Sequence, residues 1–172
     1  MKKLLGPMFL CFAISSSYAQ QTSKALVKKA TFTDDNGQRI AFELPQTWKF
    51  DGSVILSDNG KKVGEFMPGT VADCKYQSGA EYLKELRVGY PDDMGSPRFV
   101  GSRTLVIGKT TWTEGVRNVP AWDGKSNTGR WYAHSFFALL NKHCFVINFY
   151  SPQRQLPEEA KMENILASIK IL

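Results

Sequence analysis

The amino-acid sequence predicts one α+β domain, a mainly antiparallel sheet with an internal helix and a C-terminal helix packed on it. Three observations support this fold class. Two Asn-Gly turns each separate a pair of β-rich runs, residues 79–88 have helical spacing behind a capping signal, and apolar residues recur with helical spacing over residues 162–169. No repeat or low-complexity tract divides the chain, so we expect a single domain over residues 28–172.

The start of the chain has the composition of a secretory signal. Two lysines supply positive charge, residues 4–14 are mostly apolar, and Ser17 and Ala19 place small residues at the −3 and −1 positions of a cleavage site. The apolar run is shorter than the ~20 residues that a membrane-spanning helix needs. We therefore expect residues 1–19 to be a cleaved signal peptide, residues 20–27 to be a loose leader, and the mature protein to reside in the periplasm.

The charge of the mature chain is mild and mixed. Removal of residues 1–19 leaves 20 basic and 16 acidic residues, a net charge of +4. Basic and acidic residues alternate along the chain as on an ordinary solvated surface, which does not favour nucleic acid as a partner. Cys11 follows Leu10, where a lipid-modification signal has a small residue, so we expect no stable membrane anchor.

Two cysteines, Cys74 and Cys144, remain in the mature chain. In an oxidising compartment a lone pair of cysteines usually forms a disulfide. Closing a loop of about 70 residues would stabilise the fold by about 4 kcal/mol in the chain-entropy model. We favour a Cys74–Cys144 bridge, with two separate buried thiols as the alternative.

Two turn signals predict β-hairpins in the first half of the chain. Asn36-Gly37 and Asn59-Gly60 suit turns whose central residues have positive φ. The flanking β-rich runs are residues 29–33 and 39–44, and residues 53–57 and 61–67. The acidic residues beside the first turn lack the spaced oxygen ligands of a calcium loop.

The internal helix has a start signal of its own. Ser78 and Glu81 have the spacing of a capping box, in which the serine oxygen and the glutamate each accept a backbone N–H at the helix start. Tyr82 and Leu86 follow with helical spacing. The pattern predicts a helix over residues 79–88.

The second half of the chain is rich in β-forming residues. We expect strands over residues 98–107, 109–117, 130–140 and 143–150, with a third hairpin turn at Asn141-Lys142. Neither alternating set within residues 143–150 is strongly polar, which indicates a central strand covered on both faces. Pro157 suits the start of the last helix, whose apolar stripe contains Met162, Ile165, Leu166 and Ile169.

Two short motifs resemble the PsbP-like family. Residues 42–48, Phe-Glu-Leu-Pro-Gln-Thr-Trp, are similar to its strand-to-turn signature Phe-x-apolar-Pro-x-x-Trp, and residues 165–169 are similar to its terminal helix. The order of elements is similar over nearly the whole mature chain. The resemblance, which includes DcrB-like envelope proteins, implies a Mog/PsbP-type α/β/α sandwich that binds partners without chemistry. It carries over no functional residue, because the matching positions are structural.

No complete catalytic constellation is visible in the sequence. His134 and His143 are the only histidines, and a zinc site needs three or four convergent ligands. There is no Gly-x-Ser-x-Gly elbow and no phosphate-binding loop. A Cys–His pair using Cys74 or Cys144 would require a free thiol in an oxidising space. We expect a protein that is not an enzyme and that has no cofactor or metal, with both histidines structural or on the surface.

Residues 118–129 are expected to form a long polar loop that binds a partner. The loop carries Trp122, flanked by Asp123, Lys125 and Arg130, which is the composition of a contact hot spot. The alternative is that Trp122 folds back onto the sheet, since tryptophan is usually mostly buried.

These features lead to two functional hypotheses. The first is a non-catalytic periplasmic accessory protein that binds an envelope protein. The alternative is an immunity-type inhibitor that neutralises a toxic effector enzyme delivered to the periplasm. A third possibility, a small-ligand carrier, requires an apolar pocket between sheet and helix. The sequence does not indicate an oligomeric state.

Overall fold

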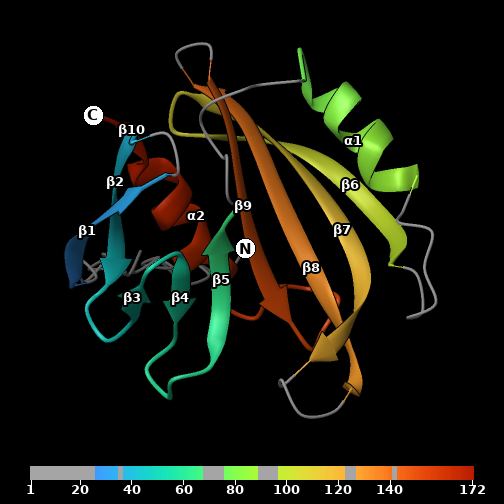
Figure 1. Ribbon diagram of the computed structural model, residues 1–172, viewed down its shortest axis with the longest axis horizontal. Coiled ribbons are helices and arrows are strands. Elements are labelled where there is room, and N and C mark those ends of the chain that lie inside the picture. The colour runs from blue at the N-terminus through green and yellow to red at the C-terminus, as the bar shows by residue number, and fades with distance from the viewer. Residues whose placement is uncertain (1–25, 35–36, 68–75, 89–96, 123–126, 141–142) are drawn as a thin grey trace, which may run out of the picture.

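Ten strands and two helices make up the described part of the chain (Figure 1). The structure is a computed structural model and describes residues 26–34, 37–67, 76–88, 97–122, 127–140 and 143–172. The elements are β1 (Val27–Thr33), β2 (Arg39–Pro45), β3 (Lys49–Asp51), β4 (Val54–Leu56), β5 (Lys62–Phe66), α1 (Gly79–Val88), β6 (Arg98–Ile107), β7 (Thr110–Trp122), β8 (Asn127–Leu140), β9 (His143–Ser151), α2 (Glu159–Ser168) and β10 (Lys170–Ile171).

The strands form two antiparallel sheets. The large sheet has seven strands in the order β3-β4-β5-β9-β8-β7-β6, and the small sheet has three in the order β1-β2-β10. Figure 1 shows α1 against one face of the large sheet, and α2 with the small sheet on the other side. We call these the outer face and the inner face. The predicted α+β class, with one internal and one C-terminal helix on an antiparallel sheet, is confirmed.

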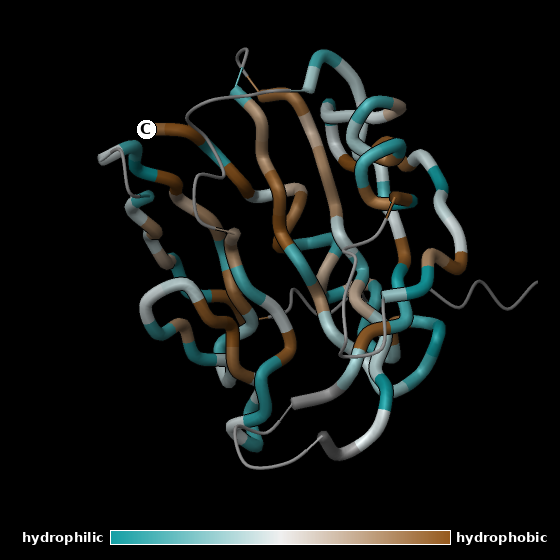
Figure 2. Tube along the Cα trace, turned by 45° about the vertical axis from the view of Figure 1, so that its right-hand side comes forward, coloured by the Kyte–Doolittle hydropathy of each residue, from teal (hydrophilic) through white to brown (hydrophobic). Residues whose placement is uncertain are grey.

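The main core fills the space between the inner face, the small sheet and α2. Phe42 of β2 lies 4.8 Å from Phe66 of β5, and Phe66 lies 5.6 Å from Phe145 of β9, measured between ring centroids. The predicted stripe of α2 faces this core, with Met162, Ile165, Leu166 and Ile169 buried. Figure 2 shows hydrophobic segments along the interior strands and hydrophilic segments mainly in the turns.

The second, smaller core lies between α1 and the outer face. Tyr82 of α1 stacks on Phe137 of β8 with ring centroids 4.9 Å apart. The helix begins as predicted: Glu81 N–H donates to Ser78 Oγ at 3.3 Å, although Glu81 Oε2 accepts from Gln77 N–H at 2.6 Å rather than from Ser78 N–H. The close packing of α1 on β7 requires a glycine at position 79, because a Cβ there would lie 1.9 Å from the Thr113 hydroxyl oxygen.

The three predicted hairpins are confirmed by the strand pairing. β1 pairs with β2 and β4 with β5, and the two turns contain Gly37 and Gly60 with φ of 79° and 75°. β8 pairs with β9 up to Leu140 and His143, on either side of the third turn. The expected central strand is β9, which lies between β5 and β8.

The prediction of a long loop over residues 118–129 is wrong for most of these residues. β7 continues to Trp122 and β8 begins at Asn127, so only residues 123–126 lie between them, outside the described residues. Pro120 suggested a loop, but β6 pairs with β7 no further than Asn118. Among the described residues, β7 pairs only with β8 beyond that point, and a proline on such an edge breaks no pairing with a second strand. β1 begins at Val27, the last residue of the expected leader.

The structure describes one of the two cysteines that were predicted to form a bridge. Cys144 is buried in the second core, and its Sγ lies 3.7 Å from the carbonyl oxygen of Tyr76. Cys74, two positions before Tyr76, lies outside the described residues, as do the expected signal peptide and most of the leader. The bridge stays a prediction, with one cysteine placed close to the segment that contains the other. No helix among the described residues is long and apolar enough to cross a membrane.

The proximity of Cys144 to Tyr76 gives the first testable prediction. The mature protein, denatured without reductant, should contain no thiol that reacts in a colorimetric titration. After reduction it should contain two, and the melting temperature should fall because the unfolded chain gains entropy. Two reactive thiols before reduction would remove the Cys74–Cys144 bridge.

The second prediction concerns the seat of α1. Gly79→Ala should lower the free energy of unfolding by about 1–3 kcal/mol, because the added methyl group must displace Thr113 or the helix. Gly101→Ala is the control, since its nearest atom outside the adjacent residues lies 3.8 Å from the added Cβ. Urea unfolding measures both. An equal effect of the two substitutions would contradict the close approach at Gly79.

Candidate functional site

The paired strands β7 and β8 extend beyond the rest of the large sheet. Val119 pairs with Trp131 and Trp122 with Asn127, whereas β6 has its last pair at Asn118 of β7. On the other side, β9 has its last pair at Tyr132 of β8. We call residues 119–122 and 127–131 the β7–β8 ribbon. It forms a two-stranded projection at the lower edge of Figure 1.

The ribbon contains two of the four predicted partner-binding residues. Trp122 is the last residue of β7, and Arg130 lies on β8 opposite Pro120. Arg130 donates hydrogen bonds from Nε to the Asn118 side chain and from Nη2 to the Asn118 carbonyl at 2.9 Å, so its guanidinium braces the base of the ribbon. Asp123 and Lys125 lie outside the described residues.

A charged cluster of three side chains lies on the inner face, in the part of the sheet next to the ribbon. Arg103, Glu114 and His134 come from the adjacent strands β6, β7 and β8, and Arg103 is paired directly with Glu114 in the strand register. Glu114 Oε1 lies 2.6 Å from His134 Nδ1, and Glu114 Oε2 accepts from Arg103 Nε. Arg103 Nη2 also contacts Glu159 in the first turn of α2. The cluster therefore joins the sheet to the start of the C-terminal helix.

The electrostatics of the cluster favour the ionised form of its carboxyl group. Burial alone would raise the pKa of Glu114, but hydrogen bonds from His134 and Arg103 outweigh burial and hold that pKa below its ordinary value. An ionised carboxylate can only accept hydrogen bonds, so Nδ1 of His134 carries the hydrogen of this contact. Nε2 of His134 has no hydrogen-bond partner among the described residues.

A cavity of about 600 Å³ lies against this cluster. Its walls come from β6, β7, β8, the connection after β9, and the first turn of α2. Val100, Val116 and Leu156 supply apolar surface. Arg154 lies on the connection, is exposed, and donates from Nη2 to the Val100 carbonyl at 3.1 Å.

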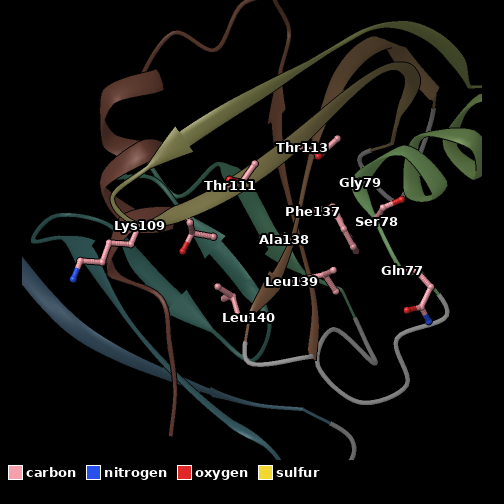
Figure 3. Close-up of a pocket in the computed structure, with 11 residues that line it drawn as sticks. Gln77, Ser78, Gly79, Lys109, Thr111, Thr113, Phe137, Ala138, Leu139 and Leu140 are labelled. Carbon is pink, nitrogen blue, oxygen red and sulfur yellow. The ribbon is translucent and has the colours of Figure 1, made fainter.

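A second cavity of about 560 Å³ lies at the outer face, beside the start of α1 (Figure 3). Ser78 and Thr113 face each other across it, and the Lys109 side chain extends away from them. The Ser78 hydroxyl oxygen already accepts the N–H of Glu81. Among the residues that line this cavity, none has a buried polar side-chain atom without a partner, so no group here requires a ligand.

The two histidines lie apart in the structure. His134 is opposite Phe149, whereas His143 is opposite Leu140 at the other end of the β8–β9 hairpin. The described residues contain no group of three or more His, Cys, Asp or Glu side chains arranged to hold a metal ion. His134 is buried, and the sequence did not indicate its partner Glu114.

The alternation of inward-facing and outward-facing residues along β7 contained a signal that Glu114 is buried. Trp112 and Glu114 are both buried, with 0% and 1% exposure, and Val116 lines the inner cavity. A carboxylate in register with inward-facing apolar residues must find a cationic or hydrogen-bonding partner inside the protein. Residues 109–117 alone could therefore have indicated a buried polar cluster, but not that Arg103 and His134 complete it.

The cluster gives the third prediction. Glu114→Gln should lower the free energy of unfolding by about 1–3 kcal/mol at pH 7, because it weakens the hydrogen bonds that the buried carboxylate accepts from His134 and Arg103. Since the folded-state pKa of Glu114 is lowered, its contribution is full above its ordinary value of 4.5 and is lost as pH falls through the lower folded value. Urea unfolding at pH 7 and pH 3 should show the difference between wild type and Glu114→Gln narrowing at pH 3.

Glu159→Gln is the matched control for Glu114→Gln. The Glu159 side chain contacts the same arginine but is 40% exposed, so its loss should cost less than about 1 kcal/mol. A pH-independent difference between wild type and Glu114→Gln would contradict the role of an ionised carboxylate in the cluster.

Comparison with known proteins returns neither a matching family model nor a matching curated protein. The resemblance to PsbP-like proteins therefore still rests on the motifs at residues 42–48 and 165–169. The structure itself offers two candidate functional sites, the β7–β8 ribbon and the charged cavity on the inner face.

Proposed function

We propose that the mature chain is a non-catalytic accessory protein of the periplasm that binds an envelope protein through the β7–β8 ribbon. The observation that carries the proposal is the extension of β7 and β8 beyond both of their neighbours, with Trp122 at the end of one strand. An aromatic residue at the end of a projecting element is well placed to act as an anchor in a partner's surface.

The base of the ribbon is held in a defined shape. The hydrogen bonds from Arg130 to Asn118 connect its two strands where they leave the sheet. Val119 and Trp131 are opposite each other on the strands just beyond this brace. A projection that is ordered before binding loses less conformational entropy on association than a loose loop, and this supports a role in recognition.

The buried cluster supports binding rather than bond-making. A His–Glu pair can serve as a catalytic base when a nucleophile is hydrogen-bonded to the free imidazole nitrogen. Nε2 of His134 has no hydroxyl or thiol partner among the described residues. Glu114 is shared between His134 and Arg103, an arrangement that suits structural cross-linking of strands.

The fold supports the same interpretation at a coarser level. Helices lie on both sides of the large sheet, which accords with the α/β/α sandwich implied by the PsbP-like resemblance. We extend the proposal to membership of that family and to export by cleavage after Ala19, with no nucleic acid partner and no membrane anchor. The Cys74–Cys144 bridge is part of the same proposal and suits an oxidising compartment.

The alternative is an immunity-type inhibitor, which the narrow shape of the ribbon also favours. A two-stranded projection can enter an enzyme's cleft, where a loop lying flat on the surface cannot. Such an inhibitor would bind one effector enzyme with a dissociation constant in the nanomolar range or below. An accessory protein would bind an envelope component and leave no enzyme inactive.

Trp122→Ala provides the fourth prediction. With the purified partner, it should weaken binding at least 10-fold, because hot-spot tryptophans contribute ~2 kcal/mol or more. It should change the melting temperature by less than about 2 °C if the side chain serves binding and not the core, since substitutions away from the core change stability little. Leu139→Ala is the matched control, because Leu139 is 43% exposed on the same strand pair but lies near the opposite end of β8.

The partner can be identified by site-specific photo-crosslinking of the chain in living cells that have a periplasm. A photoreactive amino acid at position 122 should give a discrete adduct that is absent when it replaces Lys49, an exposed residue of β3. An adduct with an enzyme whose turnover the purified chain abolishes would favour the inhibitor. A large loss of stability in Trp122→Ala, or the same adducts from both positions, would contradict the ribbon as the binding element.

A further inference from the structure

The large sheet ends at β6 in a long strand whose outer side pairs with no other strand among the described residues. β6 is the last strand in the order of this sheet, and its ten residues make it the longest edge strand that the structure describes. The edge strand on the other side of the sheet, β3, has three residues. The unpaired N–H and C=O groups of such an edge can bond to a strand of another molecule.

The turn between β6 and β7 determines which backbone groups face outward. Ile107 pairs with Thr110, so two residues separate the strands, and the pair that closes a two-residue hairpin exchanges both of its backbone hydrogen bonds. Bonded pairs alternate along an antiparallel ladder. Ser102, Thr104 and Val106 therefore direct their N–H and C=O groups away from β7. We call these three residues the β6 ladder.

The β6 ladder is accessible in the part of the chain that the structure describes. All three of its side chains are exposed, and Val106 has 75% of its surface in solvent. α1 lies on the same face of the sheet but beside the ladder. The Arg87 guanidinium carbon at its end lies 5.1 Å from the centre of the Phe99 ring, and Gly79 at its start lies against Thr113 of β7.

The charges of β6 permit the addition of a strand, unlike those of β1, the edge strand of the small sheet. β1 carries Lys28 and Lys29 in succession, and lysines on an edge disfavour pairing with another chain. Between its bulge and the turn, β6 carries a single charged side chain, Arg103. The carboxylates of Glu114 and Glu159 already engage that guanidinium.

We propose that β6 pairs with β6 of a second copy of this chain, antiparallel and with Thr104 opposite Thr104. In this register Ser102 of each copy is opposite Val106 of the other, so every group of both ladders is bonded. A shift to the neighbouring register on one side places Arg103 opposite Arg103, and like charges directly opposite are destabilising. The shift to the other side places Ser102 opposite Gly108, in the turn. The β6 ladder is thus its own best complement.

This pairing joins two seven-stranded sheets into one continuous sheet. Its two-fold axis is perpendicular to the sheet, so both copies of α1 lie on one face and the two β7–β8 ribbons point in opposite directions. Such a dimer presents two binding elements at opposite ends and can hold two partner molecules at once. The pairing itself does not depend on the proposed role of the ribbon.

Sedimentation velocity of the mature protein at pH 7 tests the pairing. Wild type should shift from the monomer mass toward twice that mass between ~1 and ~300 µM, because so small an interface associates weakly. Thr104→Pro should stay monomeric over this range. It should still fold, because proline is tolerated on an edge strand where the N–H faces away from the neighbouring strand.

Thr31→Pro is the matched control for Thr104→Pro. Asp34 N–H donates to the Gln38 carbonyl, so by the same alternation Thr31 of β1 faces away from β2 at the edge of the small sheet. This variant should dimerise as wild type does. A wild type that stays monomeric up to ~300 µM, or a dimer that Thr104→Pro leaves intact, would overturn the proposal.

Thr104→Cys gives a second readout that survives if Thr104→Pro does not fold. Opposite residues of a bonded antiparallel pair have Cα atoms about 5.5 Å apart, within reach of a disulfide. Mild oxidation should therefore link two copies through position 104, seen on a non-reducing gel, and Thr31→Cys should give no linked dimer. Equal linking of the two variants would contradict the β6 register. Trp122→Ala should leave the dimer unchanged, because Trp122 lies outside the β6 ladder.

Discussion

The need to cover both faces of β9 governs the architecture. Its inner side chains, such as Phe145 and Ile147, lie in the main core, and Cys144 and Val146 belong to the core under α1. A strand that is apolar on both faces cannot leave either one in water, because each buried aliphatic or aromatic side chain contributes about 1.5–3 kcal/mol. The chain therefore supplies α1 for the outer face and the small sheet with α2 for the inner face. The other strands of the large sheet lie on either side of β9. The ribbon projects where β7 and β8 continue beyond the last residues that pair with β6 and β9.

The features predicted correctly from the sequence are those whose signals involve residues close together in the chain. Turn residues such as Gly37 and Gly60, the helix start at Ser78 and the stripe on α2 act over a few residues, and all were predicted from sequence. The division into two sheets depends on β10, a two-residue strand that joins β2 and has no signal of its own. The charged cluster was missed because Arg103 and Glu114 are eleven residues apart and meet only through the register of β6 and β7. Proline and glycine in residues 118–129 indicated a loop, and the tertiary position of β7 at the edge overrode them.

The charged cluster lies at a junction between the sheet and the C-terminal helix. Arg103 reaches Glu114 on the sheet and Glu159 on α2, so two carboxylates from different elements share one guanidinium. An apolar contact could contribute as much stability, but it would not fix the direction in which the helix starts. Val116 and His134, which line the cavity, lie on the same strands as the ribbon, two residues before Asn118 and two after Tyr132. The charged cluster and the ribbon thus occupy neighbouring parts of one strand pair.

Within the part of the chain that the structure describes, the ribbon has no further strand paired to either side, which affects how copies of the chain would meet. Unpaired strand edges are templates on which identical molecules can stack into fibres. Pro120 has no N–H to offer an added strand, and the pairing between β7 and β8 shifts register between Pro120 and Trp122. Both features interrupt the regular ladder that a growing fibril would copy. Pro120 and the register shift therefore make the ribbon a poor template for a strand of another copy.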